Sequence, residues 1–245
     1  MPSYWKHVNQ VLRDAEIIIE VLDARMVEQT RHIEIEQKVQ RQGKILLYVF
    51  NKCDLVDPET LARHKKSLHP SVFISSREKL GTTILKKKIL ELSHGERVTV
   101  GILGYPNVGK SSLINALAGR SATLTSSESG FTRGVQKVRV DPKIMVIDTP
   151  GVFPQEENDQ QKYGTTGAVS HGKVKDPEGV VLALITEEKK AICKYYKITA
   201  EDPEEILEKI ALHLHKLLKG NLPDTETAAR LVLKDWQTGK IHKNL

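Results

Sequence analysis

The sequence predicts an α/β fold: a three-layer, doubly wound, mostly parallel sheet followed by a small α-helical C-terminal domain. Two observations predict it. Continuous apolar runs, typical of strands buried on both faces of a parallel sheet, alternate with segments whose apolar residues have helical spacing. Beyond Gly151 the chain becomes polar, and the apolar residues further on have helical spacing.

The expected strands are the apolar runs at 17–22, 45–50, 98–103 and 144–147. Residues 135–140, followed by a turn at 141–143, predict a strand that pairs antiparallel with the 144–147 strand. The expected helices lie between the strands, at about 31–42, 58–68, 81–93 and 110–119. Pro58, preceded by the N-cap candidate Asp57, indicates where the second of these helices begins. This alternation predicts the doubly wound sheet.

The C-terminal part has a different composition. Residues 154–176 are polar and rich in Gly, Gln and Lys, so we predict a mobile loop there. Two segments with helical spacing follow, at 203–219 and 224–238, each with a Pro near its start and a Gly just past its end. We therefore divide the chain into a first domain at 1–172 and a helical domain at 173–245.

Composition is typical of a soluble globular protein, with 39% hydrophobic and 28% charged residues. No apolar run approaches the about 20 residues of a membrane helix, and the first residues lack a signal-peptide apolar region. We therefore expect a cytoplasmic protein with no membrane partner. Cys53 and Cys193 lack the spacing of a zinc site, which favours a reducing compartment. The net charge of +6 favours a polyanionic partner such as RNA.

A phosphate-binding loop is predicted at residues 104–111, whose sequence GYPNVGKS matches G-x-x-x-x-G-K-[ST] between a strand and a helix. Backbone N–H groups of such a loop surround phosphates, and the helix N-terminus faces their negative charge. We expect Lys110 to contact the β- and γ-phosphates and Ser111 to bind Mg²⁺ through its hydroxyl. The other predicted contacts in this segment are Asn107, Val108, Gly109 and Ser112.

A second loop, Asn51-Lys52-Cys53-Asp54, predicts that the bound base is guanine. A carboxylate at Asp54 accepts hydrogen bonds from N1–H and the exocyclic amine of guanine, which adenine does not offer together. We expect Lys52 to lie across the base plane and Asn51 to tie this loop to the phosphate loop. Ser75 and Ser76 resemble the SAK element of GTPases, which implies that the Ser76 N–H approaches the guanine oxygen.

Two further loops complete the predicted site. Asp148-Thr149-Pro150-Gly151 follows the 144–147 strand and resembles the DxxG motif, in which the Asp holds Mg²⁺ through water and the Gly N–H contacts the γ-phosphate. These roles fall to Asp148 and Gly151. A Ser/Thr/Gly-rich stretch suited to a switch loop lies before this motif. Thr132 is the first candidate there for a second hydroxyl ligand of Mg²⁺, and Thr125 is the alternative.

The order of these motifs is permuted, because the base-reading loop precedes the phosphate loop. With Asp23-Ala24-Arg25 after the first strand and residues 229–241 near the end, this order resembles the circularly permuted GTPases of the YlqF/RbgA/YawG family over nearly the whole chain. The resemblance implies a P-loop GTPase domain at 1–172 with GTP/GDP and Mg²⁺ as cofactors. It also implies ribosome assembly through GTP-dependent RNA binding, with ribosomal RNA or a precursor of a ribosomal subunit, mostly the large one, as partner.

Val152 occupies the position at which many GTPases have a Gln that orients the hydrolytic water. Because a valine side chain cannot hydrogen-bond water, we expect slow intrinsic hydrolysis that depends on Lys110, Thr132 and Gly151. Similarity to related enzymes implies that Asn107 is a K⁺ ligand, although Asn is also a common turn residue. His7 does not have the spacing of the N-terminal His of some family members, so we expect a surface or packing residue.

Two alternatives remain open. Val152 is compatible with a GTP-dependent RNA-binding scaffold that hydrolyses negligible GTP. The other alternative is a P-loop ATPase or small-molecule kinase, against which the Asn51–Asp54 loop argues. We expect a monomer. Because the chain leaves Gly151 toward the C-terminal helices, we also predict that loss of the γ-phosphate repositions residues 177–245.

Overall fold

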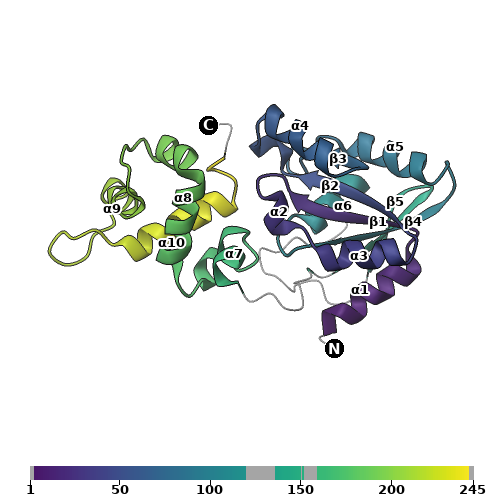
Figure 1. Ribbon diagram of the computed structural model, residues 1–245, viewed down its shortest axis with the longest axis horizontal. Helices are drawn as coiled ribbons and strands as arrows, with labels where there is room; N and C mark the ends of the chain where they lie inside the picture. The colour runs from purple at the N-terminus through teal and green to yellow at the C-terminus, as the bar shows by residue number, and fades with distance from the viewer. Residues whose placement is uncertain (1–2, 120–135, 150, 152–158, 243–245) are drawn as a thin grey trace. The chain divides into compact units, whose positions relative to one another are not determined.

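The computed structural model describes residues 3–119, 136–149, 151 and 159–242 (Figure 1). The chain forms two compact units, Met1–Glu157 and Asn158–Leu245. The predicted domain boundary between residues 172 and 173 therefore falls inside the second unit, which begins at Asn158. Among the described helices, none is long and apolar enough to cross a membrane.

The first unit contains a six-stranded sheet with the order β3-β2-β1-β4-β6-β5. Only β5, at its edge, runs antiparallel, and it pairs with β6. Both the mostly parallel sheet and the predicted antiparallel pair are therefore confirmed. The strands are β1 (Ile17–Asp23), β2 (Ile45–Asn51), β3 (Ser71–Phe73), β4 (Val98–Gly104), β5 (Gln136–Asp141) and β6 (Ile144–Asp148).

Helices cover both faces of this sheet. Side chains of α1 and α3 pack on Ile18 of β1. Leu22 is on the same face of β1 and belongs to a cluster that also contains Leu61 of α4, so α4 covers this face as well. Because the chain then crosses from β3 to β4 on the other side of β1, right-handed connections place α5 and α6 on the opposite face. Figure 1 shows α1 and α3 on one side of the strands and α5 on the other. The helices are α1 (Ser3–Asp14), α2 (Val27–Thr30), α3 (Ile33–Arg41), α4 (Pro58–Ser67), α5 (Thr82–Leu92) and α6 (Lys110–Ala118).

The strand order creates a topological switch point between β1 and β4. After β1 the chain moves to β2 and β3, and after β4 it moves to β5 and β6, on the opposite side. In such sheets, ligands bind beyond the carboxyl ends of the strands at this point. The loops that follow β1, β2, β4 and β6 all begin at this edge, because these strands are parallel.

The second unit is helical, and here two predictions were wrong in part. Its elements are α7 (Gln160–Thr165), η2 (His171–Lys173), α8 (Pro177–Tyr196), α9 (Pro203–His213) and α10 (Thr225–Gln237). The loop predicted at 154–176 contains α7 and η2, because Asp159 caps α7 and Tyr163 is buried. The helix predicted at 203–219 ends at His213, since His215 adopts a left-handed backbone (φ +54°) and Leu217 pairs with Pro223.

Candidate functional site

The phosphate loop connects β4 to α6, and its two framing glycines are both required by geometry. Gly104 has φ +147° and Gly109 has φ +97°, in the region that L side chains rarely adopt. A Cβ at Gly104 would lie 2.6 Å from the Val21 carbonyl oxygen, and one at Gly109 would lie 2.3 Å from Asn51 Nδ2. Because α6 begins at Lys110, the loop lies at a helix N-terminus, where anions bind readily.

Lys110 and Asp148 place opposite charges in the buried part of this site. The Lys110 ammonium donates to the carbonyl oxygens of Gly104 (3.1 Å) and Tyr105 (2.8 Å). Burial lowers the pKa of Lys110 to about 8, against the opposing charge of Asp148. Burial likewise raises the pKa of Asp148, although Lys110 opposes this shift. Among the described residues, no side chain donates a hydrogen bond to either Asp148 carboxylate oxygen.

This arrangement fits a magnesium ion. Mg²⁺ prefers carboxylate, hydroxyl and water oxygens. A fully buried carboxylate to which no described side chain donates is costly unless a cation or water binds it. Ser111, the other predicted ligand within the described residues, occupies the first turn of α6 directly after Lys110. The residues present therefore fit the predicted ion.

Asn51 joins the base-reading loop to the phosphate loop. Its side chain is at the carboxyl end of β2 and is buried. The amide nitrogen donates to the Val108 carbonyl oxygen at 2.8 Å, as the sequence predicts. The amide oxygen accepts from the backbone N–H (3.0 Å) and the hydroxyl (2.9 Å) of Ser76. One residue thus links three of the predicted nucleotide loops.

The Ser76 N–H donates to Asn51 Oδ1 at 3.0 Å. The predicted approach of this group to the guanine oxygen stays a prediction. The turn that follows is closed by Ser75, whose backbone exchanges two hydrogen bonds with Leu80. Ser75 Oγ also accepts from the N–H of Glu78 at 3.2 Å. The second serine loop is therefore held in place by the protein itself.

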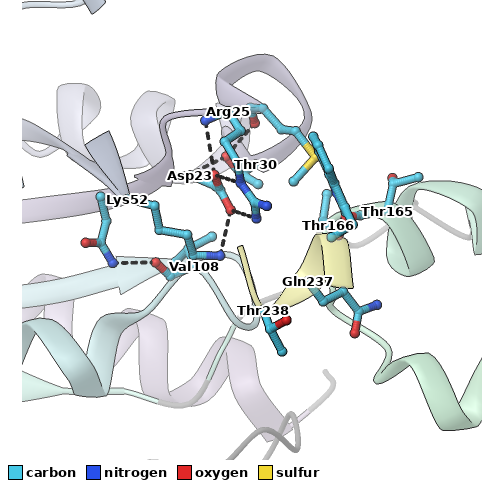
Figure 2. A network of polar contacts seen from close by, with 12 residues as sticks. Asp23, Arg25, Thr30, Lys52, Val108, Thr165, Thr166, Gln237 and Thr238 are labelled. Atoms are coloured by element: carbon cyan, nitrogen blue, oxygen red, sulfur yellow. Dashed lines mark hydrogen bonds and ion pairs between the residues drawn. The ribbon is translucent and has the colours of Figure 1, made fainter. Parts of the chain in front are cut away.

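A buried ion-pair network lies beside the base-reading loop, and Figure 2 shows it from close by. Arg25 Nε and Nη2 donate to the two carboxylate oxygens of Asp23, at 3.0 and 2.8 Å. Lys52 Nζ donates to the same carboxylate at 2.6 Å. Burial raises the pKa of Asp23, but the charges of Arg25 and Lys52 outweigh this and hold it well below its usual range.

Sequence patterns assigned Asp23 and Arg25 no role, because these residues entered only through the family resemblance. The signal that could have found them is an acid and a base two residues apart, directly after a buried strand. Such residues are rarely buried unless they are paired. Here the two side chains are each 1% exposed.

The remaining residues that sequence analysis considered for the site have different surroundings. Gly151 lies against the phosphate loop, since a Cβ there would be 2.8 Å from Pro106 Cα. Asn107 has a left-handed backbone (φ +61°), a conformation that Asn tolerates. This backbone conformation supports the alternative that Asn107 is a turn residue. Asp54 is in the short helix η1 (Cys53–Leu55), Ser112 is on α6, and His7 is on α1. Thr132, its rival Thr125 and Val152 lie outside the described residues.

Comparisons with known protein families find two overlapping matches. A family described as 50S ribosome-binding GTPase matches residues 99–217, and one described as RsgA GTPase matches residues 17–156. Two solved structures have similar folds: YlqF from T. maritima bound to GNP and bound to GDP. Their TM-scores are 0.68 and 0.69 at 23% and 22% identity, and the matches cover 97% and 96% of this chain and 94% and 95% of theirs.

Relatives that match nearly the whole of this chain are also found. An uncharacterized GTP-binding protein of Methanocaldococcus jannaschii is 38% identical over 246 residues, covering 97% of this chain and 65% of that protein. The nuclear GTP-binding protein NUG1 of Saccharomyces cerevisiae is 32% identical over 286 residues, covering 98% of this chain and 55% of that protein. The chain thus spans between half and two thirds of the length of these two relatives.

Proposed function

The chain belongs to the circularly permuted P-loop GTPases of the YlqF/RbgA/YawG family, and from this we propose that it binds GTP and hydrolyses it to GDP and phosphate. We propose that hydrolysis switches the binding of the chain to RNA or the ribosome during assembly of a ribosomal subunit. We further propose a cytoplasmic monomer that acts on the large subunit. The family name 50S ribosome-binding GTPase supports this subunit, and the net charge of +6 supports an RNA partner.

One observation carries the nucleotide part of the proposal: the 2.8 Å hydrogen bond from Asn51 to the Val108 carbonyl oxygen. It joins a loop suited to bind guanine to a loop suited to bind phosphates. The base and the phosphates of one nucleotide can therefore bind together at the carboxyl ends of the strands. An ATPase or small-molecule kinase has no need of the Asp54 carboxylate at this place. The GTP-binding relatives support the same choice.

In the proposed mechanism the residues of the chain position and neutralise the phosphates. Lys110 contacts the β- and γ-phosphates and Gly151 donates its N–H to the γ-phosphate. Ser111, Thr132 and, through water, Asp148 would hold Mg²⁺. When bound, that ion neutralises charge that develops on the phosphate oxygens. Nucleotide contacts from Lys52, Ser75, Val108, Gly109 and Ser112 complete the proposed site.

The purified chain tests this function directly. We expect GTP to compete for binding far better than ATP, and we expect GDP and phosphate to form slowly alone and faster with large ribosomal subunits. Equal binding of ATP and GTP would refute the guanine site. Co-sedimentation with ribosomal subunits in the presence of GDP or a non-hydrolysable GTP analogue tests the switch, since equal binding in both states contradicts it.

A second candidate function is a GTP-dependent RNA-binding scaffold with negligible hydrolysis. The observation that favours it is Val152, because its side chain cannot orient water. Single-turnover hydrolysis with and without ribosomal particles separates the two candidates. If no phosphate forms in either case while nucleotide still controls sedimentation, the scaffold is correct.

Potassium dependence is a further part of the proposal. If Asn107 is a K⁺ ligand, replacing Na⁺ by K⁺ accelerates turnover. Asn107→Gly is the matched variant, since glycine keeps the left-handed backbone at φ +61° while removing the amide oxygen. We expect this variant to turn over at the same rate in both salts. A wild-type rate that is equal in K⁺ and Na⁺ removes potassium from the mechanism.

A further inference from the structure

The contact between Asp23 and Lys52 joins two loops that follow neighbouring strands. Asp23 ends β1 and Asn51 ends β2, and the two residues are paired in the parallel register. Lys52 is the next residue along from Asn51, so its stem starts beside the Asp23 backbone. The ammonium then reaches the Asp23 carboxylate at 2.6 Å, while the side chain as a whole is 22% exposed.

A structural ion pair alone does not explain this network. Arg25 already binds both Asp23 carboxylate oxygens through a planar fork and balances the charge. Lys52 is a second cation on the same carboxylate, and burial and the charge of Arg25 lower the pKa of its ammonium there, against the charges of Asp23 and Asp54. Lys52 also has a left-handed backbone (φ +60°), which is costly for a residue with a Cβ. Two unfavourable features thus coincide on the residue expected to lie across the base.

The Asp23 carboxylate is itself held rigidly. Its oxygen Oδ1 accepts from both the backbone N–H and Nε of Arg25, at 3.1 and 3.0 Å. The Asp23 N–H donates to Thr30 Oγ1 at 3.1 Å, and that hydroxyl donates to the Met26 carbonyl oxygen at 2.8 Å. A lysine stem is flexible and loses much rotamer freedom when it is fixed. A rigid acceptor at its end supplies the fixed position that a flat base needs.

We propose that Asp23 is a positioning residue of the guanine site: held by Arg25, it anchors the Lys52 ammonium so that the methylene stem of Lys52 forms a fixed wall against the base plane. The proposal deepens the proposed function and rests on it. It predicts that Asp23 sets the affinity for the purine ring. It does not set the recognition of the exocyclic amine, which is the task of Asp54.

The test is a double-mutant cycle with Asp23→Asn and Lys52→Met, read by calorimetric titration of the full chain with Mg²⁺ and either GDP or IDP, which lacks the exocyclic amine. We expect Asp23→Asn to raise both dissociation constants by about tenfold, since a hydrogen bond to a charged group is lost. The ratio of the two constants stays unchanged. In the Lys52→Met background, we expect Asp23→Asn to raise each dissociation constant by a further factor of about two or less.

Two further variants guard against an effect on folding alone. Asp23→Glu keeps the charge beside Arg25, so the protein folds, but it displaces the carboxylate by one methylene and weakens GDP binding as well. Asp57→Asn is the matched control: it removes the N-cap carboxylate that accepts from the Thr60 N–H (2.8 Å), in the segment that follows the base-reading loop. We expect it to leave GDP affinity unchanged.

The outcomes separate this proposal from the proposed function. If wild-type protein binds no GDP, the nucleotide site itself is wrong. If wild type binds GDP and both Asp23 variants bind it equally well, or if Asp23→Asn weakens binding by the same factor with and without Lys52, the positioning role is wrong.

Discussion

Replacing Asn51 by alanine tests the hydrogen bonds that connect the predicted nucleotide loops. The substitution removes three hydrogen bonds: one from Asn51 Nδ2 to the Val108 carbonyl oxygen and two from Ser76 to Asn51 Oδ1. Each contributes about 1 kcal/mol net, so we expect a loss of about 3 kcal/mol in the free energy of unfolding. For a domain of about 150 residues this lowers the melting temperature by roughly 6–12 °C.

Ser76→Ala provides the calibration, because it removes only the hydroxyl hydrogen bond at 2.9 Å and leaves the backbone N–H contact intact. We expect a loss of about 1 kcal/mol. The double variant should be no less stable than Asn51→Ala, since the hydroxyl then has no acceptor to lose.

Differential scanning calorimetry of the nucleotide-free chain measures these melting temperatures, and amide exchange at Ser76 reports the loop directly. We expect faster exchange of that amide in Asn51→Ala. The reasoning is refuted if Asn51→Ala melts within about 2 °C of wild type, which is the smallest shift expected from the loss of a single hydrogen bond. It is equally refuted if the Ser76→Ala effect persists in full without Asn51.

Three further predictions concern charge and packing. Lys110→Ala should abolish GTP binding in calorimetric titration, and unchanged binding would refute the phosphate site. Glu20 is fully buried, and burial together with the charge of Glu36 raises its pKa well above 4.5. The folded state therefore retains a proton that the unfolded state releases, and the free energy of unfolding falls as the pH rises past 4.5. Glu20→Gln should therefore stabilise the protein at pH 7 by about 1–3 kcal/mol and lose this advantage near pH 4 in urea unfolding. Gly164→Ala should destabilise the second unit by about 1–3 kcal/mol in the same assay, since its Cβ would lie 2.8 Å from a Val180 methyl, whereas Gly172→Ala, with open space around it, should not.

Sequence patterns predict the sheet well because its determinants are local. The run at 17–22 is apolar at nearly every position, and the structure buries every residue of β1. The start of α4 was equally readable, since Asp57 caps it and Pro58 is its first residue. The two loops predicted to bind nucleotide can be recognised in the sequence because the chemistry of phosphate and guanine dictates their residue types.

What the sequence could not predict depends on partners that are distant along the chain. The helix α7 is polar, but Trp236 Nε1 donates to the Thr165 carbonyl oxygen at 3.0 Å and Gln237 Nε2 donates to that of Gly164 at 2.8 Å. No local pattern contains these contacts. The engagement of the Ser76 N–H by Asn51, 25 residues earlier, is hidden for the same reason.

The site survives the permuted motif order because it depends on strands that are neighbours in space. β1 lies between β2 and β4, and the register pairs Asp23 with Asn51 and Val21 with Gly104, so the loops begin within two residues of one another along the sheet. This register is enforced by burial, because a slip of one residue would exchange the two faces of β1 and move Glu20 to the wrong layer. The apolar residues of β1 thus do more than fill the core. They set the position from which Asp23 reaches Lys52 and from which Gly104 approaches Val21, and so they determine the geometry of the site.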